Sequence, residues 1–269
     1  MTIEDNLRAR YGNEVPEVIA GPVFDLLLSH RTWRRFEDRP LPPKTIETLV
    51  AAGQSAASSS NLQSWSVVTI EDPARRKELM EIGAGQPQIG EAPATLCFVA
   101  DLARLARIAD DNEQPREALD HLEHFVVGAI DAALAAQNIC IAAEALGLGT
   151  CYLGVLRNEP ERLAKFLNLP PKAVVVFGLS IGYPDTSRSA RIKPRLAQKS
   201  ILHRETYNLE DAVAPVGDYE TLLGAFNANE RNGQPRWGLR SSGRIVNAEI
   251  LDGRADLANV LKRLGFPLK

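Results

Sequence analysis

The chain has 269 residues, enough for one main domain with a continuous core and an appended segment. It carries 31 Lys and Arg against 34 Asp and Glu, and 45% of its residues are hydrophobic, as in an ordinary globular protein. This near-neutral balance requires neither a nucleic-acid nor a membrane partner, and we expect neither. The acidic start Met1–Asn6 has no apolar run behind it and does not resemble a signal peptide, so we expect a cytoplasmic location.

The first part of the chain mixes helical and strand patterns. An apolar run at Val23–Leu28 precedes a basic, extended segment, His30–Arg35. Pro42-Pro43 opens a helix that Gly53 ends, and Pro73 starts another short helix. Alternation and β-branched residues predict strands at 65–70, 94–100, 150–154 and 173–181.

A long helix is predicted from about Arg116 to Leu146. Apolar residues lie around much of its circumference, so we expect it to be enclosed on most sides. It also carries Asp131 and Glu144, whose burial in hydrocarbon would be costly, so it is interpreted as a buried helix and not as a membrane span.

The end of the chain has a different character. Beyond Tyr183 the pattern is irregular, and residues 208–269 contain two short helical patterns but too little apolar surface for a core of their own. We therefore expect a core at residues 1–207 and a C-terminal arm at 208–269 that packs on the core or on a partner subunit.

The cysteines predict no disulfide. Cys97, Cys140 and Cys151 all have apolar neighbours and form no Cys-x-x-Cys pair. Buried free thiols are the expected state.

Two cationic segments are candidate anion sites. In Lys193-Pro194-Arg195 the proline favours extended geometry, which projects the lysine and the arginine to the same side, as a phosphate would require. The segment His30–Arg35 adds further cations and the Thr32 hydroxyl. For each segment alone, a solvated surface turn or strand is the alternative.

The run Ser58-Ser59-Ser60-Asn61 offers several hydrogen-bond donors to a flat heteroaromatic ring. A loop chosen only for its turn chemistry explains the same run equally well.

Three competing motifs lack their required context. Gly178-Leu179-Ser180-Ile181-Gly182 fits the hydrolase pattern with Ser180 as nucleophile, but it lies within a long apolar run and no helix follows. Glu117, His121 and His124 share a face of the predicted helix, yet no further ligands complete a metal site, and we expect none. The glycines after residue 146 miss the dinucleotide-binding spacing.

Taken in order, several segments resemble the nitroreductase family of FMN enzymes, and most closely its larger, NADPH-preferring, oxygen-insensitive branch. The matching segments are His30-Arg31-Thr32-Trp33-Arg34, Ala57–Gln63, Gly85-Gln86, Ala142–Gly149, Tyr152–Asn158, Phe177–Pro184 and Lys193-Pro194-Arg195. Each segment is weak alone, whereas their joint order and spacing are specific. The same resemblance explains Ser180 as a strand residue.

The resemblance implies an α+β fold in which helices wrap a mostly antiparallel sheet, and a homodimer with two FMN molecules at the subunit interface. By position, the residues that resemble the family's FMN contacts fall into four groups: His30, Arg31, Thr32, Lys193 and Arg195 at the phosphate and ribityl chain; Arg34 at the pyrimidine edge; Ser58, Ser59, Ser60 of the partner subunit and Gln86 at the ring; and Tyr152, Leu153, Gly154 and Val155 with their backbone toward flavin N5. Thr32 stands where the family usually has serine, which is a mild change. Val155 stands where close relatives often have glycine, and its branched side chain would narrow the space for the substrate.

The implied activity is hydride transfer from NADPH, or NADH, to nitroaromatics, quinones or similar small acceptors by a ping-pong mechanism. FMN carries the chemistry, so no catalytic side chain beyond the flavin is required, and Arg34 tunes the ring as a cation. Arg231, Arg236, Arg240 and Arg244 are candidates for the NADPH 2′-phosphate or form a solvated basic face. A flavin reductase, a flavin carrier and a serine hydrolase are the alternatives.

Overall fold

The computed structural model describes residues 2–19, 21, 23–188, 190–228 and 236–269. Its described residues form two compact units. The first comprises Met1–Arg31 and Ser189–Leu251, and the second comprises Thr32–Arg188 and Asp252–Lys269. This division of contacts does not follow the expected division of the sequence at residue 207, so the C-terminal arm at 208–269, packed on the core or on a partner subunit, stays a prediction.

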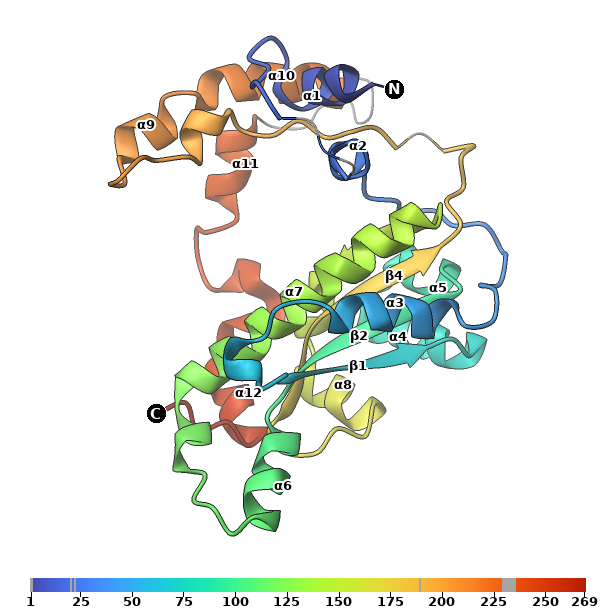
Figure 1. Cartoon of the computed structure of the whole chain (residues 1–269), viewed down its shortest axis with the longest axis vertical. Coiled ribbons are helices and arrows are strands. Elements are labelled where there is room, and N and C mark those ends of the chain that lie inside the picture. Colours follow the sequence, from blue (N-terminus) through green and yellow to red (C-terminus); the bar gives the residue numbers. More distant parts are fainter. Residues whose placement is uncertain (1, 20, 22, 189, 229–235) are drawn as a thin grey trace. The chain divides into compact units, whose positions relative to one another are not determined.

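The second unit is built on a four-stranded sheet in the order β1-β2-β4-β3 (Figure 1). All neighbouring strands are antiparallel. The strands are β1 (Trp65–Ile70), β2 (Ala94–Asp101), β3 (Gly149–Leu153) and β4 (Ala173–Gly182). Each lies where alternation and β-branched residues predict it, and the predicted α+β class with an antiparallel sheet is confirmed.

Strand β2 shows why both faces of the sheet are covered. Successive side chains of a strand point to opposite faces, and Leu96 and Phe98 enter one hydrophobic cluster while Cys97 and Val99 enter another. All four side chains are buried. Helices from different parts of the chain complete the two clusters.

Two helices of the second unit begin near the predicted prolines: α3 (Thr45–Gln54) follows Pro42-Pro43, and α4 (Pro73–Ile82) starts at Pro73. The others are α5 (Pro87–Glu91), α6 (Ala103–Asp111), α7 (Leu122–Ala145), α8 (Pro160–Phe166) and α12 (Leu257–Arg263), with short 3-10 turns η1 (Ser59–Asn61), η2 (Glu117–Asp120) and η3 (Gly154–Arg157). Helices α3, α7 and α12 supply residues to one cluster, and α4, α5 and α8 to the other.

Helix α7 differs from its prediction in two ways. The predicted start at Arg116 is wrong, because η2 is separated from α7 by His121, whose φ and ψ of −85° and 149° are extended. The expectation of enclosure on most sides is also wrong. Leu122, Val126, Ile130 and Leu134, one turn apart along one side of α7, are exposed.

Of the described helices, only α7 is long and apolar enough to cross a membrane. Its other side packs in the core, where Ala132, Ala136 and Ile139 are fully buried. Asp131, also buried, accepts hydrogen bonds there. These features are those of the core helix of a folded domain.

The last residues of the chain pack on the second unit. Leu261 of α12 and Phe266 lie in the cluster that contains Phe98. The N–H of Lys172 donates to the carbonyl of Leu264 at 2.8 Å, and the N–H of Lys269 donates to that of Asp120 at 2.9 Å. This part of the predicted arm therefore belongs to a core that it could not form alone.

The described residues of the first unit form short helices around a small apolar centre. The helices are α1 (Ile3–Tyr11), α2 (Phe24–Ser29), α9 (Leu209–Val213), α10 (Val216–Ala228) and α11 (Trp237–Gly243), with η4 (Gln198–Ser200) and, across the boundary to the second unit, η5 (Glu249–Asp256). A capping box between Thr2 and Asp5 begins α1. Tyr219 and Trp237 meet edge to face, with ring centroids 5.4 Å apart.

Candidate functional site

Arg10 of α1 joins the two cationic segments of the first unit. Its side chain is buried, at 7% exposure. Its guanidinium donates to the carbonyls of Leu28 at 3.0 Å and His30 at 3.1 Å, while its own carbonyl accepts from the N–H of Arg195 at 2.9 Å. The sequence interpretation missed Arg10. The only signal for it is its spacing from Leu7, which places both on the buried face of α1.

Exposure alternates along the Lys193-Pro194-Arg195 segment, as an extended chain with the lysine and the arginine on one side requires. Pro194 is buried, whereas Lys193 and Arg195 on either side of it are exposed. One end of the Arg195 guanidinium donates to the carbonyls of Lys193 and Pro194, each at 3.2 Å. In the other segment, Nε of Arg31 donates to the carbonyl of Ser29 at 3.2 Å. In each segment, an arginine guanidinium is therefore held by hydrogen bonds to nearby backbone carbonyls.

In the second unit, Thr32 and Arg34 lie along β3. Thr32 forms a β-bridge with Thr150, and the N–H of Trp33 donates to the carbonyl of Thr150 at 2.9 Å. A Cβ at Gly149 would lie 2.8 Å from the Trp33 ring, so this close approach requires glycine. Burial raises the pKa of the Cys151 thiol, and the charge of Arg34 opposes that rise, which places the exposed Arg34 near β3.

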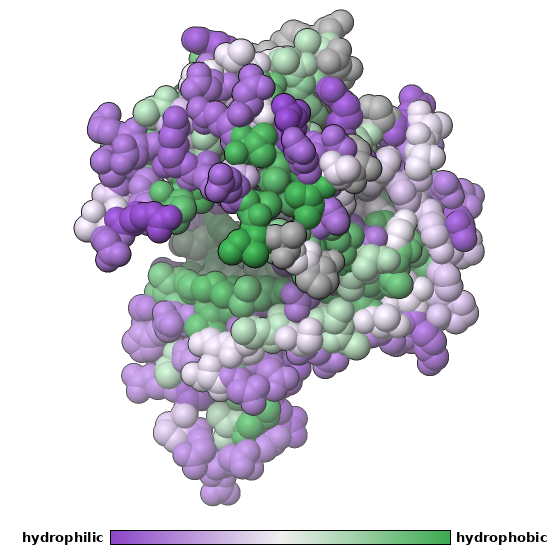
Figure 2. All heavy atoms as spheres, turned by 45° about the horizontal axis from the view of Figure 1, so that its top comes forward, coloured by the Kyte–Doolittle hydropathy of each residue, from purple (hydrophilic) through white to green (hydrophobic). Residues whose placement is uncertain are grey.

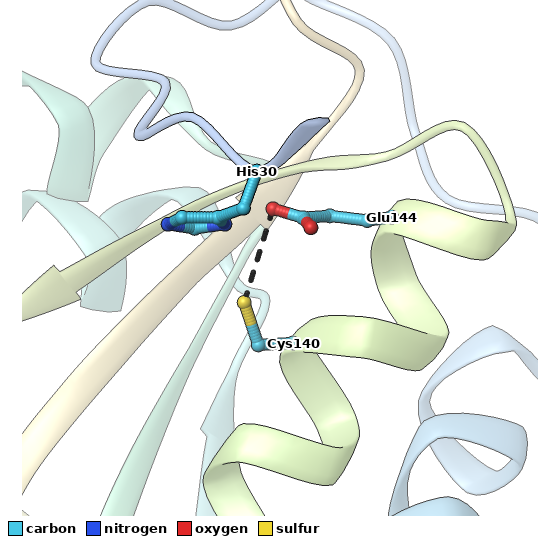
Figure 3. Close-up of side chains that lie close together, drawn as sticks. All are labelled: His30, Cys140 and Glu144. Carbon is cyan, nitrogen blue, oxygen red and sulfur yellow. Dashed lines mark hydrogen bonds between the residues drawn. The ribbon is translucent and has the colours of Figure 1, made fainter. Parts of the chain in front are cut away.

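The start of β3 is also held by α7. Cys140 Sγ lies 3.2 Å from the Thr150 hydroxyl, and both residues are buried. Figure 3 shows Cys140 and Glu144 one turn apart on α7, with the thiol donating to the Glu144 carboxylate over 4.0 Å. All three cysteines are free and buried, as predicted.

Tyr152 presents its ring at the end of β3. Its side chain is 40% exposed, and its hydroxyl donates to Gln137 Oε1 at 3.4 Å. Burial raises the pKa of this phenol, so it stays protonated. Leu153 is buried, so only its main chain can meet a ligand, whereas Gly154 and Val155 in η3 are half-buried.

An aromatic row crosses the sheet from Tyr152. Its ring meets Phe177 of β4 at 5.7 Å, Phe177 meets Phe98 of β2 at 5.2 Å, and Phe98 meets Trp65 of β1 at 6.4 Å, all between centroids. Every strand contributes one ring. The position of the Tyr152 ring is therefore set by its packing against Phe177 and, through Phe177, against the other rings of the row.

Gln86 precedes α5 as its N-terminal flanking residue and is half-buried. Its Oε1 accepts a hydrogen bond from Gln88 Nε2 at 2.7 Å. Gly85 before it has a φ of +70°, which favours glycine and turns the chain into α5. The Gln86 amide N–H₂ is the group that can face a ligand.

The serine run is organised by Asp131 of α7. The hydroxyl of Ser58 donates to Asp131 Oδ2 at 2.7 Å, and the N–H of Ser59 donates to Oδ1 at 3.2 Å. Ser59 and Ser60 are exposed, while Ser58 is half-buried. In the sequence, Asp131 stands out only as a polar residue in an apolar helix, and that is the signal that could have identified its role.

The hydrolase motif is ruled out as a catalytic site. Ser180 lies within β4, its side chain is fully buried, and its hydroxyl pairs with that of Thr95 at 3.2 Å. A nucleophile must be reached by its substrate.

The helical face that would join Glu117, His121 and His124 does not form. Glu117 lies in η2, His121 is extended, and only His124 lies in α7. The spacing argument for a metal site at these residues therefore has no basis.

The basic residues at the end of the first unit are described in part. Arg231 lies outside the described residues. Arg236, Arg240 and Arg244 are spaced by one helical turn along α11 and its flanks, and Arg236 pairs with Glu220 at 3.8 Å. The helix thus carries a basic face.

Two family profiles match the sequence. The nitroreductase family profile matches residues 27–183, and the profile of the nitroreductase family C-terminal domain matches residues 193–269. Among curated relatives, an FMN reductase (NADPH) of Bacillus subtilis is 34% identical over 248 residues, which is 90% of this chain and 97% of the relative. A second B. subtilis protein, FMN reductase [NAD(P)H], is 38% identical over 215 residues, 79% of this chain and 85% of the relative.

Solved structures share the fold. Bacillus megaterium NfrA2 superposes with a TM-score of 0.86 at 30% identity, covering 93% of this chain and all (100%) of that structure. The NADPH:FMN oxidoreductase of Vibrio harveyi, solved with NAD⁺, has a TM-score of 0.80 at 29% identity, again covering 93% of this chain. Because the profile matches most of the chain and the relatives match nearly all of it, the protein belongs to the nitroreductase family.

Proposed function

We propose that this protein is an FMN-dependent oxidoreductase that passes hydride from NADPH, or NADH, to nitroaromatics, quinones or similar small acceptors by a ping-pong mechanism. The observation that supports it best is the exposed pair Lys193 and Arg195, held on ordered backbone by Arg10, within a chain of the nitroreductase family. FMN and NADPH are also the molecules in the names of its relatives.

The residues present suit FMN. A phosphate requires cations and hydrogen-bond donors, and the first unit offers His30, Arg31, Lys193 and Arg195. In the second unit, we assign the Thr32 hydroxyl to the phosphate and ribityl chain. The remaining proposed contacts are Arg34 at the pyrimidine edge, Ser58, Ser59 and Ser60 of the partner subunit and Gln86 at the ring, and Tyr152, Leu153, Gly154 and Val155 with their backbone toward N5.

Bound FMN would supply the hydride chemistry. The protein's residues would bind and orient the cofactor and exclude competing reactions. Arg34 would hold its positive charge at the pyrimidine edge of bound FMN and stabilise negative charge there. The backbone from Leu153 to Val155 is held by the buried Leu153 side chain and by η3, so its N–H groups are fixed before a ligand arrives. The donor and the acceptor use the same space in turn, which is the origin of ping-pong kinetics.

A flavin reductase is the second candidate. It is favoured by the relatives, two of which carry the name FMN reductase. Such an enzyme would accept free FMN as the molecule to be reduced. A flavin carrier would bind FMN without reacting with NADPH.

Three measurements separate these functions. Purified protein should be yellow, and anaerobic NADPH should bleach the flavin band, whereas a carrier keeps its colour. Initial rates with varied NADPH and a nitroaromatic should give parallel double-reciprocal lines. Faster turnover with free FMN than with nitroaromatics or quinones would favour the flavin reductase. A colourless protein that binds no added FMN would overturn the proposal.

The homodimer is part of the proposal. Its support is the exposed stripe of Leu122, Val126, Ile130 and Leu134 on α7, because contiguous apolar surface on a folded protein marks an interface. Figure 2 shows hydrophobic surface gathered between polar residues on the face that it draws. We also propose a cytoplasmic location, which suits three buried free thiols.

A further inference from the structure

The loop Ser58–Ser64, which carries the candidate ring contacts, has an unfavourable backbone conformation at several residues. Ser60, Asn61 and Gln63 have φ values of 49°, 55° and 50°, in the left-handed region that favours glycine. None of these residues is a glycine, so each conformation costs free energy that the surroundings must offset. A loop of this kind keeps its shape only where other groups hold it.

Asp131 is one such group. Its carboxylate is buried at 1% exposure. Oδ2 accepts from the Ser58 hydroxyl at 2.7 Å and from the Ser64 N–H at 3.0 Å, while Oδ1 accepts from the Ser59 N–H at 3.2 Å. The Ser58 oxygen in turn accepts from the N–H of Gln63 at 2.7 Å. One side chain of α7 thus fixes both ends of the loop and, through Ser58, its interior.

These bonds require two acceptor oxygens. An asparagine at position 131 would place an N–H₂ group either against the Ser64 N–H or against the Ser59 N–H. Either orientation sets donor against donor at a buried side chain, which costs free energy. The loop therefore depends on the charge and the acceptor pair of Asp131, and not on its size.

A second group holds the far end of the loop. Arg104 of α6 donates to the carbonyls of Gln63 and Trp65, the latter at 2.7 Å. Trp65 begins β1 and is the last ring of the aromatic row that starts at Tyr152. With both ends held by Asp131 of α7, and the far end also by Arg104 of α6, the exposed side chains of Ser59 and Ser60 are presented at fixed positions.

We propose that Asp131 is a positioning residue for FMN: it holds the loop Ser58–Ser64 in the strained form that presents Ser59 and Ser60 to the flavin ring. This rests on the proposed assignment of the serine run to FMN. The proposal also gives the three serines different roles. The Ser58 hydroxyl is bonded to Asp131 and to the Gln63 N–H and supports the loop, so Ser59 and Ser60 are left to contact the ring.

The test compares full-length wild type with Asp131→Asn and Asp120→Asn. Asp120 is the matched control, since its carboxylate also accepts side-chain hydrogen bonds in the second unit, from Lys172 and Lys269, but it holds no proposed FMN contact. The readouts are the dissociation constant for FMN, from flavin fluorescence quenching, and the visible circular dichroism of protein saturated with FMN, which reports how the ring is held.

Asp131→Asn should weaken FMN binding about tenfold or more and change the visible circular dichroism at saturation, while Asp120→Asn changes neither. Wild-type affinity and spectrum in folded Asp131→Asn protein would overturn the inference, as would equal losses in the control. If Asp131→Asn does not fold, Ser58→Ala decides, since it removes only the hydroxyl link; it should weaken binding severalfold, and an unchanged constant overturns the inference. Failure of wild type to bind FMN would instead overturn the proposed function.

Discussion

The N–H of Arg195 donates to the carbonyl of Arg10 at 2.9 Å, while the Arg10 guanidinium donates to the carbonyl of His30 at 3.1 Å. A single buried arginine therefore links two segments that are remote in the sequence. Both segments carry cations proposed to bind the FMN phosphate. Arg10 itself is turned toward backbone carbonyls, so it organises the cations and does not add to them.

Arg10→Gln should lower the free energy of unfolding by about 1–3 kcal/mol, because backbone carbonyls lose their charged donor. It should also weaken FMN binding about tenfold, since the cations lose their fixed spacing. Arg8→Gln, on the same helix, is the control: its side chain is exposed and pairs with Glu4 at 3.2 Å. Urea denaturation and FMN titration of both variants test this, and similar losses in both would contradict the special role of Arg10.

Arg195→Ala should weaken FMN binding by about tenfold or more, since a lost charge-assisted hydrogen bond costs about 1.5–3 kcal/mol. The control is Arg107→Ala, which removes an exposed arginine that pairs with Asp111 on α6. Fluorescence titration gives both dissociation constants. An affinity for FMN that equals that of wild type would remove Arg195 from the phosphate site.

Ser180→Ala should leave the reductase rate per bound flavin nearly unchanged, because the hydroxyl is buried and pairs with that of Thr95. The cost should be one of stability, about 1–3 kcal/mol, since the Thr95 hydroxyl loses its buried partner. Activity is normalised to flavin content to separate the two effects. A collapse of activity in folded, flavin-loaded protein would restore Ser180 as a candidate nucleophile.

Ile130→Glu should convert the proposed dimer to monomer and promote loss of FMN, because it places a charge in the middle of the exposed stripe on α7. Ile108→Glu on α6 is the control, as Ile108 is equally exposed, at 50% against 52%, but lies outside the stripe. If the site needs both chains, FMN should also stabilise the wild-type dimer. Sedimentation at several concentrations tests this, and a monomer with full flavin occupancy would rule out a two-chain site.

Asp120 should make the packing of the C-terminus depend on pH. Hydrogen bonds from Lys172 and Lys269 lower the pKa of the Asp120 carboxyl below its ordinary value of about 4. A folded-state pKa below the unfolded one adds stability above the unfolded pKa, and this is lost as the pH falls through the folded pKa. Urea midpoints of wild type and Asp120→Asn should therefore differ at pH 6, and the difference should shrink as the pH falls below about 4; a difference that does not change with pH would contradict this origin.

The sequence alone determined the local elements. The strands β1 and β4 lie where alternation and β-branched residues predict them, and Pro73 begins α4 as expected, because these signals act between near neighbours in the chain. The ordered motifs also determined the family, since their joint spacing is specific even where each motif is weak.

The tertiary structure decided what depends on distant partners. The helical pattern alone predicted neither the extended His121 before α7 nor which side of α7 packs in the core and which side is exposed. Arg10 and Asp131 are ordinary charged residues in the sequence, and their roles arise only when folding brings them to the carbonyls of Leu28 and His30 and to the serine loop. Hydrogen-bond partners of buried charges are set by the packing of the whole chain, so no local pattern encodes them.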